Sequence, residues 1–278
     1  MAGMIVLGFV LAVLLVIVLA VVLGLREGRD RPWSFEIGAV IGGAFRAMGR
    51  RPLGMFGTAL IVSAVPLIAL YFALGAVRFQ DIHPAALGPA VLLYVALYLV
   101  VAVLGDLVIL RLAVTALRGE AEPPAETMRN VLAVLLPALF AAVVMGIAIA
   151  IGLAFLILPG LFLIIVWTCV MPAIVGDGTS VFQAFGRSYR LSEGARGRIL
   201  LLRMLVWIGW FVASLAAGMI GGIVSTILPG SLVPILVINL LNGMVYAVLR
   251  STVSASVFHH LRIAKEGDDG EELEAVFA

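Results

Sequence analysis

The sequence has few charged residues, only three histidines and a single cysteine among its 278 residues. Charged residues make up 12% of the chain and hydrophobic residues 63%, and the mean hydropathy is +1.21. A soluble globular domain of this size needs more polar side chains than that to cover its surface. The composition therefore excludes an ordinary soluble protein and predicts a chain whose main solvent is lipid.

The same scarcity restricts the chemistry that the chain could perform. The single cysteine, Cys169, excludes an intramolecular disulfide and lies in an apolar run, which is typical of a small core residue. The sequence has no Walker A motif, no His-Glu-x-x-His motif and no dinucleotide fingerprint. His259 and His260 are adjacent and point to different sides of a helix, which favours interfacial histidines over metal ligands. We therefore predict no catalytic residue, no metal and no cofactor, and we expect that the protein is not an enzyme.

Long apolar runs recur along the chain, and at about 1.5 Å per residue they can cross a hydrocarbon core of about 30 Å. Leu-Pro-Gly occurs at 158–160 and again at 228–230, and each copy predicts a reversal between two spans because proline and glycine interrupt a helix. The sequence therefore predicts an all-α integral membrane protein with seven transmembrane helices. The expected spans are 4–25, 52–77, 89–117, 130–157, the first Leu-Pro-Gly to 175, 199–228 and 232–263.

Two segments have an apolar stripe at helical spacing with arginines beside it, which is typical of helices that lie in the membrane interface. They cover residues 35–51 and 179–191, and Ser180 and Gln183 of the second have the spacing of a capping box. A third, shorter interfacial helix is predicted near 123–129, within a polar patch that contains two prolines. The arginines expected to contact lipid headgroups are Arg46, Arg50, Arg51, Arg187 and Arg190.

An interfacial helix followed by two spans occurs three times, so the sequence predicts an internal repeat. Residues 32–263 are then expected to form a six-helix membrane domain of three related hairpins. The span before this domain is followed by a basic cluster, whereas a cleaved secretory signal begins with one. Residues 1–31 are therefore expected to remain attached as an N-terminal transmembrane anchor. Residues 264–278 are rich in acidic residues and glycine and are expected to form a flexible cytoplasmic tail.

The placement of arginine predicts the orientation in the membrane. If the carboxyl end of the first span is cytoplasmic, nearly all arginines near span ends lie on that side, and only Arg78 lies on the other. We therefore expect a multi-pass protein of the cell membrane, in a bacterial plasma membrane, with its N-terminus outside and its C-terminus in the cytoplasm. The expected partners are membrane lipids of the anionic inner leaflet and a protein that binds the tail or the first helix. No nucleic acid is expected.

A polar stripe occurs within the last predicted span, where four polar residues are spaced by three, four and four and so share one helix face. Its two asparagines fall near the bilayer midplane, so this face is predicted to point into the bundle. The two arginines near the inner interface are expected to be snorkelling anchors, and the one intramembrane aspartate is expected to pair with either of them. The predicted intramembrane polar face comprises Asp106, Arg111, Asn239, Asn242, Tyr246 and Arg250.

Contacts between helices are the favoured role for the two asparagines. Interhelical hydrogen bonds are worth about 0.6 to 2 kcal/mol each, and such bonds are favoured here over a site for a solute. Ser214, Gly218 and Gly222 recur every four residues, which predicts that this face of the sixth span packs closely against another helix.

One long string combines several of these features. The residues ILPGLFLIIVWTCVMPAIV at 157–175, followed by VFQAFGRSYRLSEG at 181–194, resemble the membrane-domain family of glycerophosphoryl diester phosphodiesterases and its stand-alone relatives of unknown function. The unit FEIGAVIGGAFRAMGRRPLGMF and the Ser188-x-x-Leu191 step are similar to that family as well, whereas Asp177 stands where the family more often has glutamate. The resemblance covers about 35–261 and implies a helical membrane domain. The family's phosphodiesterase activity resides in a separate soluble barrel, which these residues do not encode.

Three classes of function remain open. A non-catalytic membrane protein that organises or regulates lipids or partner proteins is favoured by the scarcity of reactive side chains. A transporter or channel for a small solute or lipid is the first alternative, and it requires polar groups at the bilayer midplane. The second alternative is a role in lipid metabolism, as an accessory subunit of an enzyme. A lipid-modifying enzyme in its own right requires a clustered acid, base or metal, which the sequence does not indicate.

Overall fold

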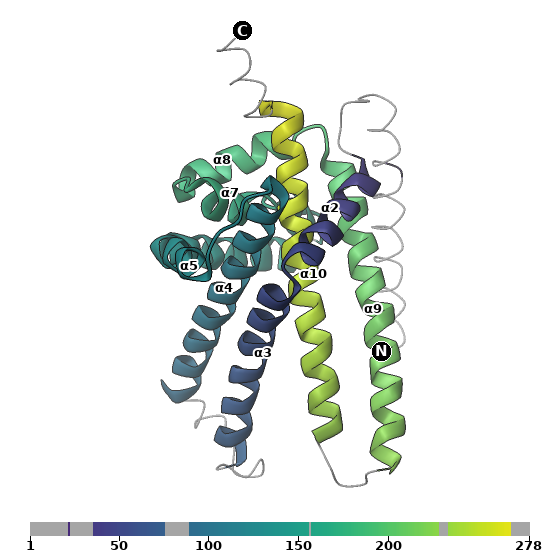
Figure 1. Cartoon of the computed structure of the whole chain (residues 1–278). Helices are drawn as coiled ribbons and strands as arrows, with labels where there is room; N and C mark the ends of the chain where they lie inside the picture. Colours follow the sequence, from purple (N-terminus) through teal and green to yellow (C-terminus); the bar gives the residue numbers. More distant parts are fainter. Residues whose placement is uncertain (1–21, 23–35, 76–88, 156, 228–232, 268–278) are drawn as a thin grey trace.

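The computed structural model describes residues 22, 36–75, 89–155, 157–227 and 233–267, and every element bounded within these ranges is an α-helix. Figure 1 shows their arrangement. In chain order the helices are α2 (Ile37–Arg50), α3 (Pro52–Gly75), α4 (Pro89–Arg118), α5 (Pro124–Phe155), α6 (Ile157–Val166), α7 (Val170–Asp177), α8 (Val181–Ser192), α9 (Arg196–Ile227) and α10 (Val233–Glu266).

Four described segments are long and apolar enough to cross a membrane, namely Val95–Arg118, Pro124–Phe155, Leu158–Asp177 and Arg196–Val224. The expected class, a helical protein with apolar helices of spanning length, is confirmed. The expected number of seven spans is not confirmed by the described residues. The first expected span at 4–25, the second Leu-Pro-Gly turn and the tail beyond 267 lie outside them.

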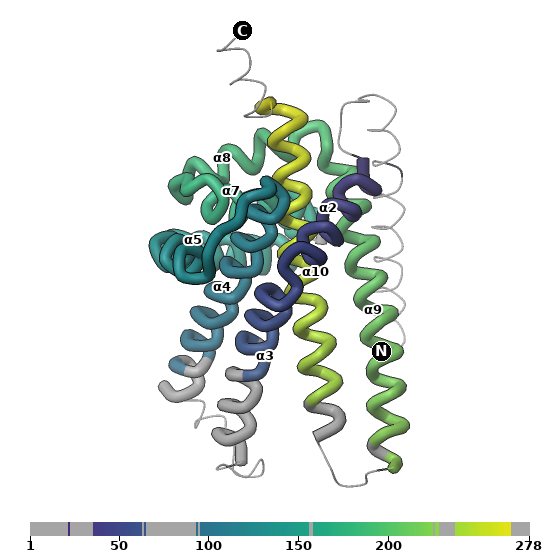
Figure 2. The backbone as a smooth tube through the Cα atoms, viewed as in Figure 1, coloured from purple at the N-terminus to yellow at the C-terminus, as the bar shows by residue number. Residues whose placement is uncertain are grey.

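The helices do not all run in one direction. In Figure 1, α3, α4, α9 and α10 are seen from the side, whereas α5 is seen almost along its axis, so α5 crosses the other four. The trace in Figure 2 shows the segment after α4 turning back along that helix before α5 begins. Arg111 of α4 binds the Glu122 carboxylate, which draws this segment back by about seven residues, or roughly 10 Å, from the end of α4.

The third interfacial helix does not exist as a separate element. Residues 124–155 form one uninterrupted helix, so the segment near 123–129 forms only the first turns of α5. Proline is accommodated at the first position of a helix, where its missing N–H has no partner to lose. A separate amphipathic helix precedes α3 and α9, as α2 and α8, but none precedes α5 among the described residues. The structure therefore does not confirm the threefold repeat.

The expected reversal at the first Leu-Pro-Gly is present but begins earlier. Helix α5 ends at Phe155 and α6 begins at Ile157, so Pro159 and Gly160 lie in the first turn of α6. A Cβ atom on Gly152 would lie 2.9 Å from both the Cα and the N of Gly160, so the two helix backbones touch here. Glycine at both positions is what permits this approach.

Replacing Gly152 with valine is expected to destabilise the α5–α6 hairpin by about 1–3 kcal/mol, because the new side chain meets rigid backbone. Thermal unfolding of the purified protein in detergent measures the change. Gly209 of α9 is an exposed helical glycine, and a Cβ there would meet nothing within 4 Å, so Gly209→Val is the control. Equal losses in both variants would show that valine within a helix, not the backbone contact, is responsible.

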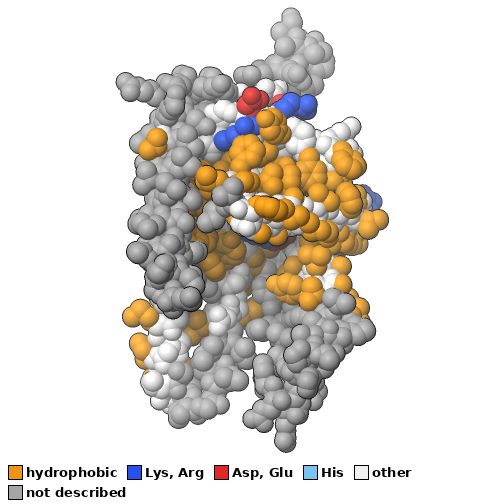
Figure 3. All heavy atoms as spheres, turned by 180° about the vertical axis from the view of Figure 1, so that it is seen from behind, with side chains coloured by type: hydrophobic (Ala, Val, Ile, Leu, Met, Phe, Trp, Pro, Cys, Tyr) orange, Lys and Arg blue, Asp and Glu red, His pale blue; other side chains and the backbone are white. Residues whose placement is uncertain are grey.

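Every helix from α2 to α10 contributes buried residues to the core, and α4 contributes the most. Phe258 of α10, Met55 of α3 and Leu107 of α4 are among its largest fully buried side chains. Helix α2 is held against α10 by the Ser256 hydroxyl, which donates to the Val40 carbonyl over 2.7 Å. Charged side chains gather at the end of the molecule near α8, while apolar side chains cover the middle of the face in Figure 3.

Candidate functional site: a charged cavity between helices

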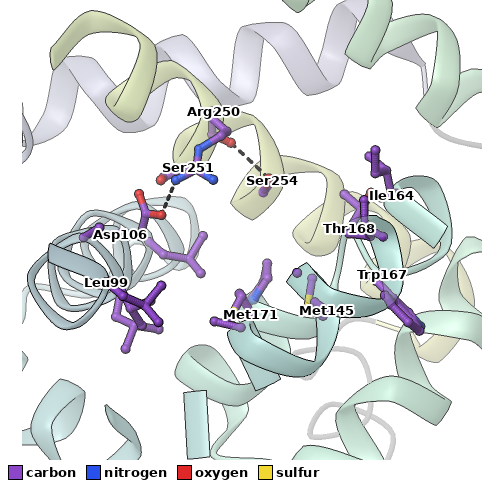
Figure 4. Close-up of a pocket in the computed structure, with 18 of the residues that line it drawn as sticks. Leu99, Asp106, Met145, Ile164, Trp167, Thr168, Met171, Arg250, Ser251 and Ser254 are labelled. Atoms are coloured by element: carbon purple, nitrogen blue, oxygen red, sulfur yellow. Dashed lines mark hydrogen bonds and ion pairs between the residues drawn. The ribbon is translucent and has the colours of Figure 1, made fainter. Parts of the chain in front are cut away.

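A cavity of about 470 Å³ lies between α4, α5, the α6–α7 pair, α9 and α10. Figure 4 shows Asp106 on one wall, Arg250, Ser251 and Ser254 of α10 on another, and Trp167 and Thr168 opposite Asp106. Most of the lining is apolar, including Leu99, Val103, Met145, Ile149 and Met171. The polar lining residues are Asp106, Thr168, Arg203, Arg250, Ser251 and Ser254, and no histidine or cysteine is among the lining residues.

Asp106 and Arg250 form an ion pair across the cavity between α4 and α10. Pairing of Asp106 with one of two arginines was expected, and the structure assigns it to Arg250. The two side chains are 34% and 43% exposed, so the pair lies at an open part of the cavity wall. Arg250 therefore has a carboxylate partner within the protein, and its expected role as a snorkelling anchor stays a prediction.

Arg203 of α9 is a site residue that the sequence analysis missed. Its Nε donates to the Thr168 hydroxyl over 3.3 Å, and its Nη2 donates to the Ser254 hydroxyl over 3.4 Å. No described carboxylate forms an ion pair with it. The sequence did contain a signal for this residue. Arg203 lies seven residues after Arg196, the first residue of α9, and an ionisable residue within an apolar helix often marks a functional site.

The cavity borders a break between two helices. Helix α6 ends at Val166 and α7 begins at Val170, so backbone groups near this point lose their helical partners. The Ser188 hydroxyl of α8 donates to the Val166 carbonyl over 2.6 Å and accepts from the Cys169 N–H over 3.1 Å. Ser188 is fully buried. One serine thus satisfies both sides of the break, as neighbouring side chains do for broken membrane helices.

Arg111, the other expected anchor, binds a carboxylate of the protein. It forms a two-pronged contact with Glu122, with Nε to Oε2 at 3.0 Å and Nη2 to Oε1 at 2.9 Å. The same carboxylate accepts from Thr127 at 3.2 Å and from Asn130 at 2.6 Å. The Arg111 hydrogen bonds are the main reason why the pKa of Glu122 is lowered, with Asn130 and Thr127 adding to the effect. This group joins α4 to α5.

The arginines expected to contact lipid headgroups divide into two sets. Arg51 donates to the carbonyls of Glu122 and Glu120, at 2.7 and 3.4 Å, and Arg187 pairs with Asp177 and Glu266. Both guanidinium groups are therefore engaged within the protein. Arg46, Arg50 and Arg190 are exposed, although Arg50 also donates to the Ala116 carbonyl.

The rest of the expected polar face lies between α9 and α10. The Asn242 amide donates to the Ser214 hydroxyl over 2.9 Å, and the Tyr246 ring lies 4.5 Å from the Trp210 ring. Asn239 lies one turn before Asn242 on α10. Interhelical hydrogen bonding, favoured for these amides, is thus confirmed for Asn242.

Two other expected contacts differ in the structure. A Cβ atom would meet nothing within 4 Å at Gly218 or Gly222, whereas at Gly221 it would contact Ile238 at 3.4 Å. The contact face therefore follows a spacing of three and four from Ser214 to Gly221, in step with 3.6 residues per turn. Ser180 is the N-cap of α8, but its side chain makes no capping hydrogen bond, so the expected capping box is wrong.

The described residues contain no group of three histidine, cysteine, aspartate or glutamate side chains that could hold a metal ion. The cavity instead offers guanidinium donors and hydroxyl groups, which can bind and orient a ligand. Comparison of the chain with protein-family models, curated proteins and solved structures finds no match in any of the three.

Proposed function

We propose that the chain is a non-catalytic, multi-pass membrane protein that holds an amphipathic, lipid-like ligand in the cavity between α4, α5, the α6–α7 pair, α9 and α10. The observation that carries this proposal is an apolar cavity of about 470 Å³ with charged groups on its wall. Ligand sites are typically cavities of this size, mostly apolar, with a few polar groups that fix orientation. The polar groups of this cavity can bind the polar end of a ligand. The described residues contain no cluster of side chains that could hold a metal ion.

The orientation that we propose is the one expected from arginine placement, with the C-terminus in the cytoplasm of a bacterium. Exposed Arg46 and Arg190 lie beside the exposed aromatic residues Phe45 and Tyr189, at the amphipathic helices α2 and α8. An aromatic ring in the apolar boundary beside a cation at anionic headgroups fits the membrane interface. A protein partner of the tail and the resemblance to the phosphodiesterase membrane domains stay predictions.

Filling the cavity tests the function. Gly146 lines it, and a Cβ at this position would meet nothing within 4 Å, so the side chain of Gly146→Leu has room to enter the cavity and reduce its volume. We expect this variant to fold normally and to retain less co-purified lipid, counted by mass spectrometry of the intact protein released from detergent. Gly209→Leu on the exposed side of α9 is the control, since a Cβ there also meets nothing. Equal lipid retention in the wild type and both variants would refute a ligand in this cavity.

Transport is the second candidate, and one observation favours it. The α6–α7 break lies beside the cavity, and transporters commonly form their binding sites at interrupted helices. A protein that only holds its ligand should bind without moving it between leaflets. Flux of the bound lipid across reconstituted vesicles, abolished by Gly146→Leu and retained by Gly209→Leu, would favour transport over simple binding.

A further inference from the structure

We propose that the cavity binds the oxyanion headgroup of its ligand, a carboxylate or a phosphate, through the guanidinium group of Arg203. This inference rests on the proposed function and specifies the charge of the ligand and the residue that binds it. The charges, the hydrogen bonds and the apolar surroundings of the cavity support it.

The charges on the cavity wall do not balance. Its ionisable lining residues are two arginines, Arg203 and Arg250, and one carboxylate, Asp106. Asp106 is taken by Arg250. Arg203 is left as a cation facing a largely apolar cavity, and an isolated charge in such surroundings is strongly disfavoured unless it is paired. The missing charge is negative and must come from outside the described residues or from a ligand.

The neighbours of Arg203 hold it but do not neutralise it. The Thr168 hydroxyl donates its proton to the Ile164 carbonyl over 2.9 Å, and the Ser254 hydroxyl donates its proton to the Arg250 carbonyl over 3.0 Å. Both oxygens therefore turn lone pairs toward Arg203, which fixes the guanidinium from two sides with dipoles. The contacts are long, at 3.3 and 3.4 Å, and use two of five N–H donors. The remaining donors suit the two oxygens of a carboxylate or phosphate.

The rest of the lining identifies the other end of the ligand. Apolar side chains form most of the wall, chiefly leucine, isoleucine and methionine, and they offer nothing to a small hydrated anion. An anion that carries an apolar chain satisfies both parts of the cavity. A free phosphate or carboxylate ion shares the headgroup chemistry, so the experiment includes both sources.

Trp167 lines the cavity and can report on its occupant. In a protein whose other three tryptophans are replaced by phenylalanine, ω-bromoundecanoate is expected to quench Trp167 with an affinity at least about tenfold higher than neutral ω-bromoundecanol, which has the same chain. Inorganic phosphate should not compete if the ligand is an amphiphile. Competition by phosphate at the same concentration as the bromoundecanoate would instead identify a free anion as the source.

The Arg203→Gln variant is expected to abolish the preference for the anion, whereas Arg203→Lys should retain part of it. Arg46→Gln removes an exposed arginine of α2 and should leave the preference unchanged, which excludes a general effect of surface charge. Equal binding of the acid and the alcohol in the wild type would overturn this inference and leave the proposed function standing. If neither probe quenches Trp167 and Gly146→Leu retains its lipid, the proposed function itself fails. Folding of each variant is checked by its thermal unfolding in detergent.

Discussion

Replacing Glu122 with alanine is expected to reduce the free energy of unfolding by about 3 kcal/mol or more, because it leaves a shielded guanidinium without its carboxylate. The Arg111 and Glu122 side chains are only 18% and 9% exposed, and their contact is two-pronged. The substitution also removes the acceptor of Thr127 and Asn130, which begin α5. Because this carboxylate ties α5 to α4, we expect α5 to lose its crossing position first. Thermal unfolding in detergent measures the loss.

The matched control is Glu126→Ala, because Glu126 lies in the first turn of α5 and is exposed. It should change stability by no more than about 1 kcal/mol, the value of a favourable charge at a helix N-terminus. If Glu122→Ala does not fold, the milder Glu122→Gln and the double variant with Arg111→Gln complete a coupling cycle. Additive effects in that cycle would contradict a direct interaction between the two side chains.

The Glu122 effect also has a defined pH dependence. Its pKa in the folded protein is lowered from the ordinary value of 4.5, mainly by the Arg111 hydrogen bonds. A lowered folded pKa means that the stabilisation is present in full above the unfolded value and is lost as the pH falls through the folded value. The stability difference between the wild type and Glu122→Gln should therefore be constant near neutral pH and shrink below about pH 4.5. A difference that grows on acidification would contradict this assignment.

Features that depend on local spacing could be predicted from the sequence. Helices α2 and α8 coincide with the predicted amphipathic segments because an apolar stripe of period 3.6 is a property of the segment alone. The partner of Asp106 could be narrowed to Arg111 or Arg250, because Asp106 is the one acidic residue in the apolar part of α4 and these two arginines were expected near it. The choice between the two arginines depended on the pairing of Arg111 with Glu122, a tertiary contact that local spacing does not reveal.

Features that depend on tertiary partners could not be predicted. The polar residues near 123–129 suggest an interfacial helix, yet Thr127 and Asn130 are satisfied by Glu122, so they continue into α5. An arginine at the end of a span has the same sequence signature whether it meets lipid or a carboxylate. Arg187 meets Asp177 and Glu266, which lie 10 and 79 residues away in the chain. The ionisable residues of the cavity come from α4, α9 and α10, so no single segment of the sequence shows that its charges are unequal.

Replacing Ser188 with alanine is expected to reduce the free energy of unfolding by about 2–4 kcal/mol, because two buried backbone groups lose their partner together. The hydroxyl bridges the Val166 carbonyl and the Cys169 N–H, and each buried group left unsatisfied costs about 1–3 kcal/mol. Ser192 provides the control. It is equally buried, but its hydroxyl donates only to the Tyr189 carbonyl within its own helix over 3.0 Å. Ser192→Ala should therefore lower the free energy of unfolding by no more than about 1 kcal/mol, the net value of one hydrogen bond.

The Ser188 substitution connects stability to the cavity. Thr168 lies inside the break that Ser188 bridges, and its hydroxyl is one of the two groups that hold Arg203. When the bridge is removed, the Val166 carbonyl and Cys169 N–H must find other partners, and the simplest route is a continuous helix through the break. That rearrangement would rotate Thr168 away from Arg203. We therefore expect Ser188→Ala to weaken quenching of Trp167 by the anionic probe as well as to lower stability, whereas Ser192→Ala should leave the quenching unchanged. A destabilised Ser188→Ala protein with unaltered anion preference would separate the break from the site and restrict the serine to a structural role.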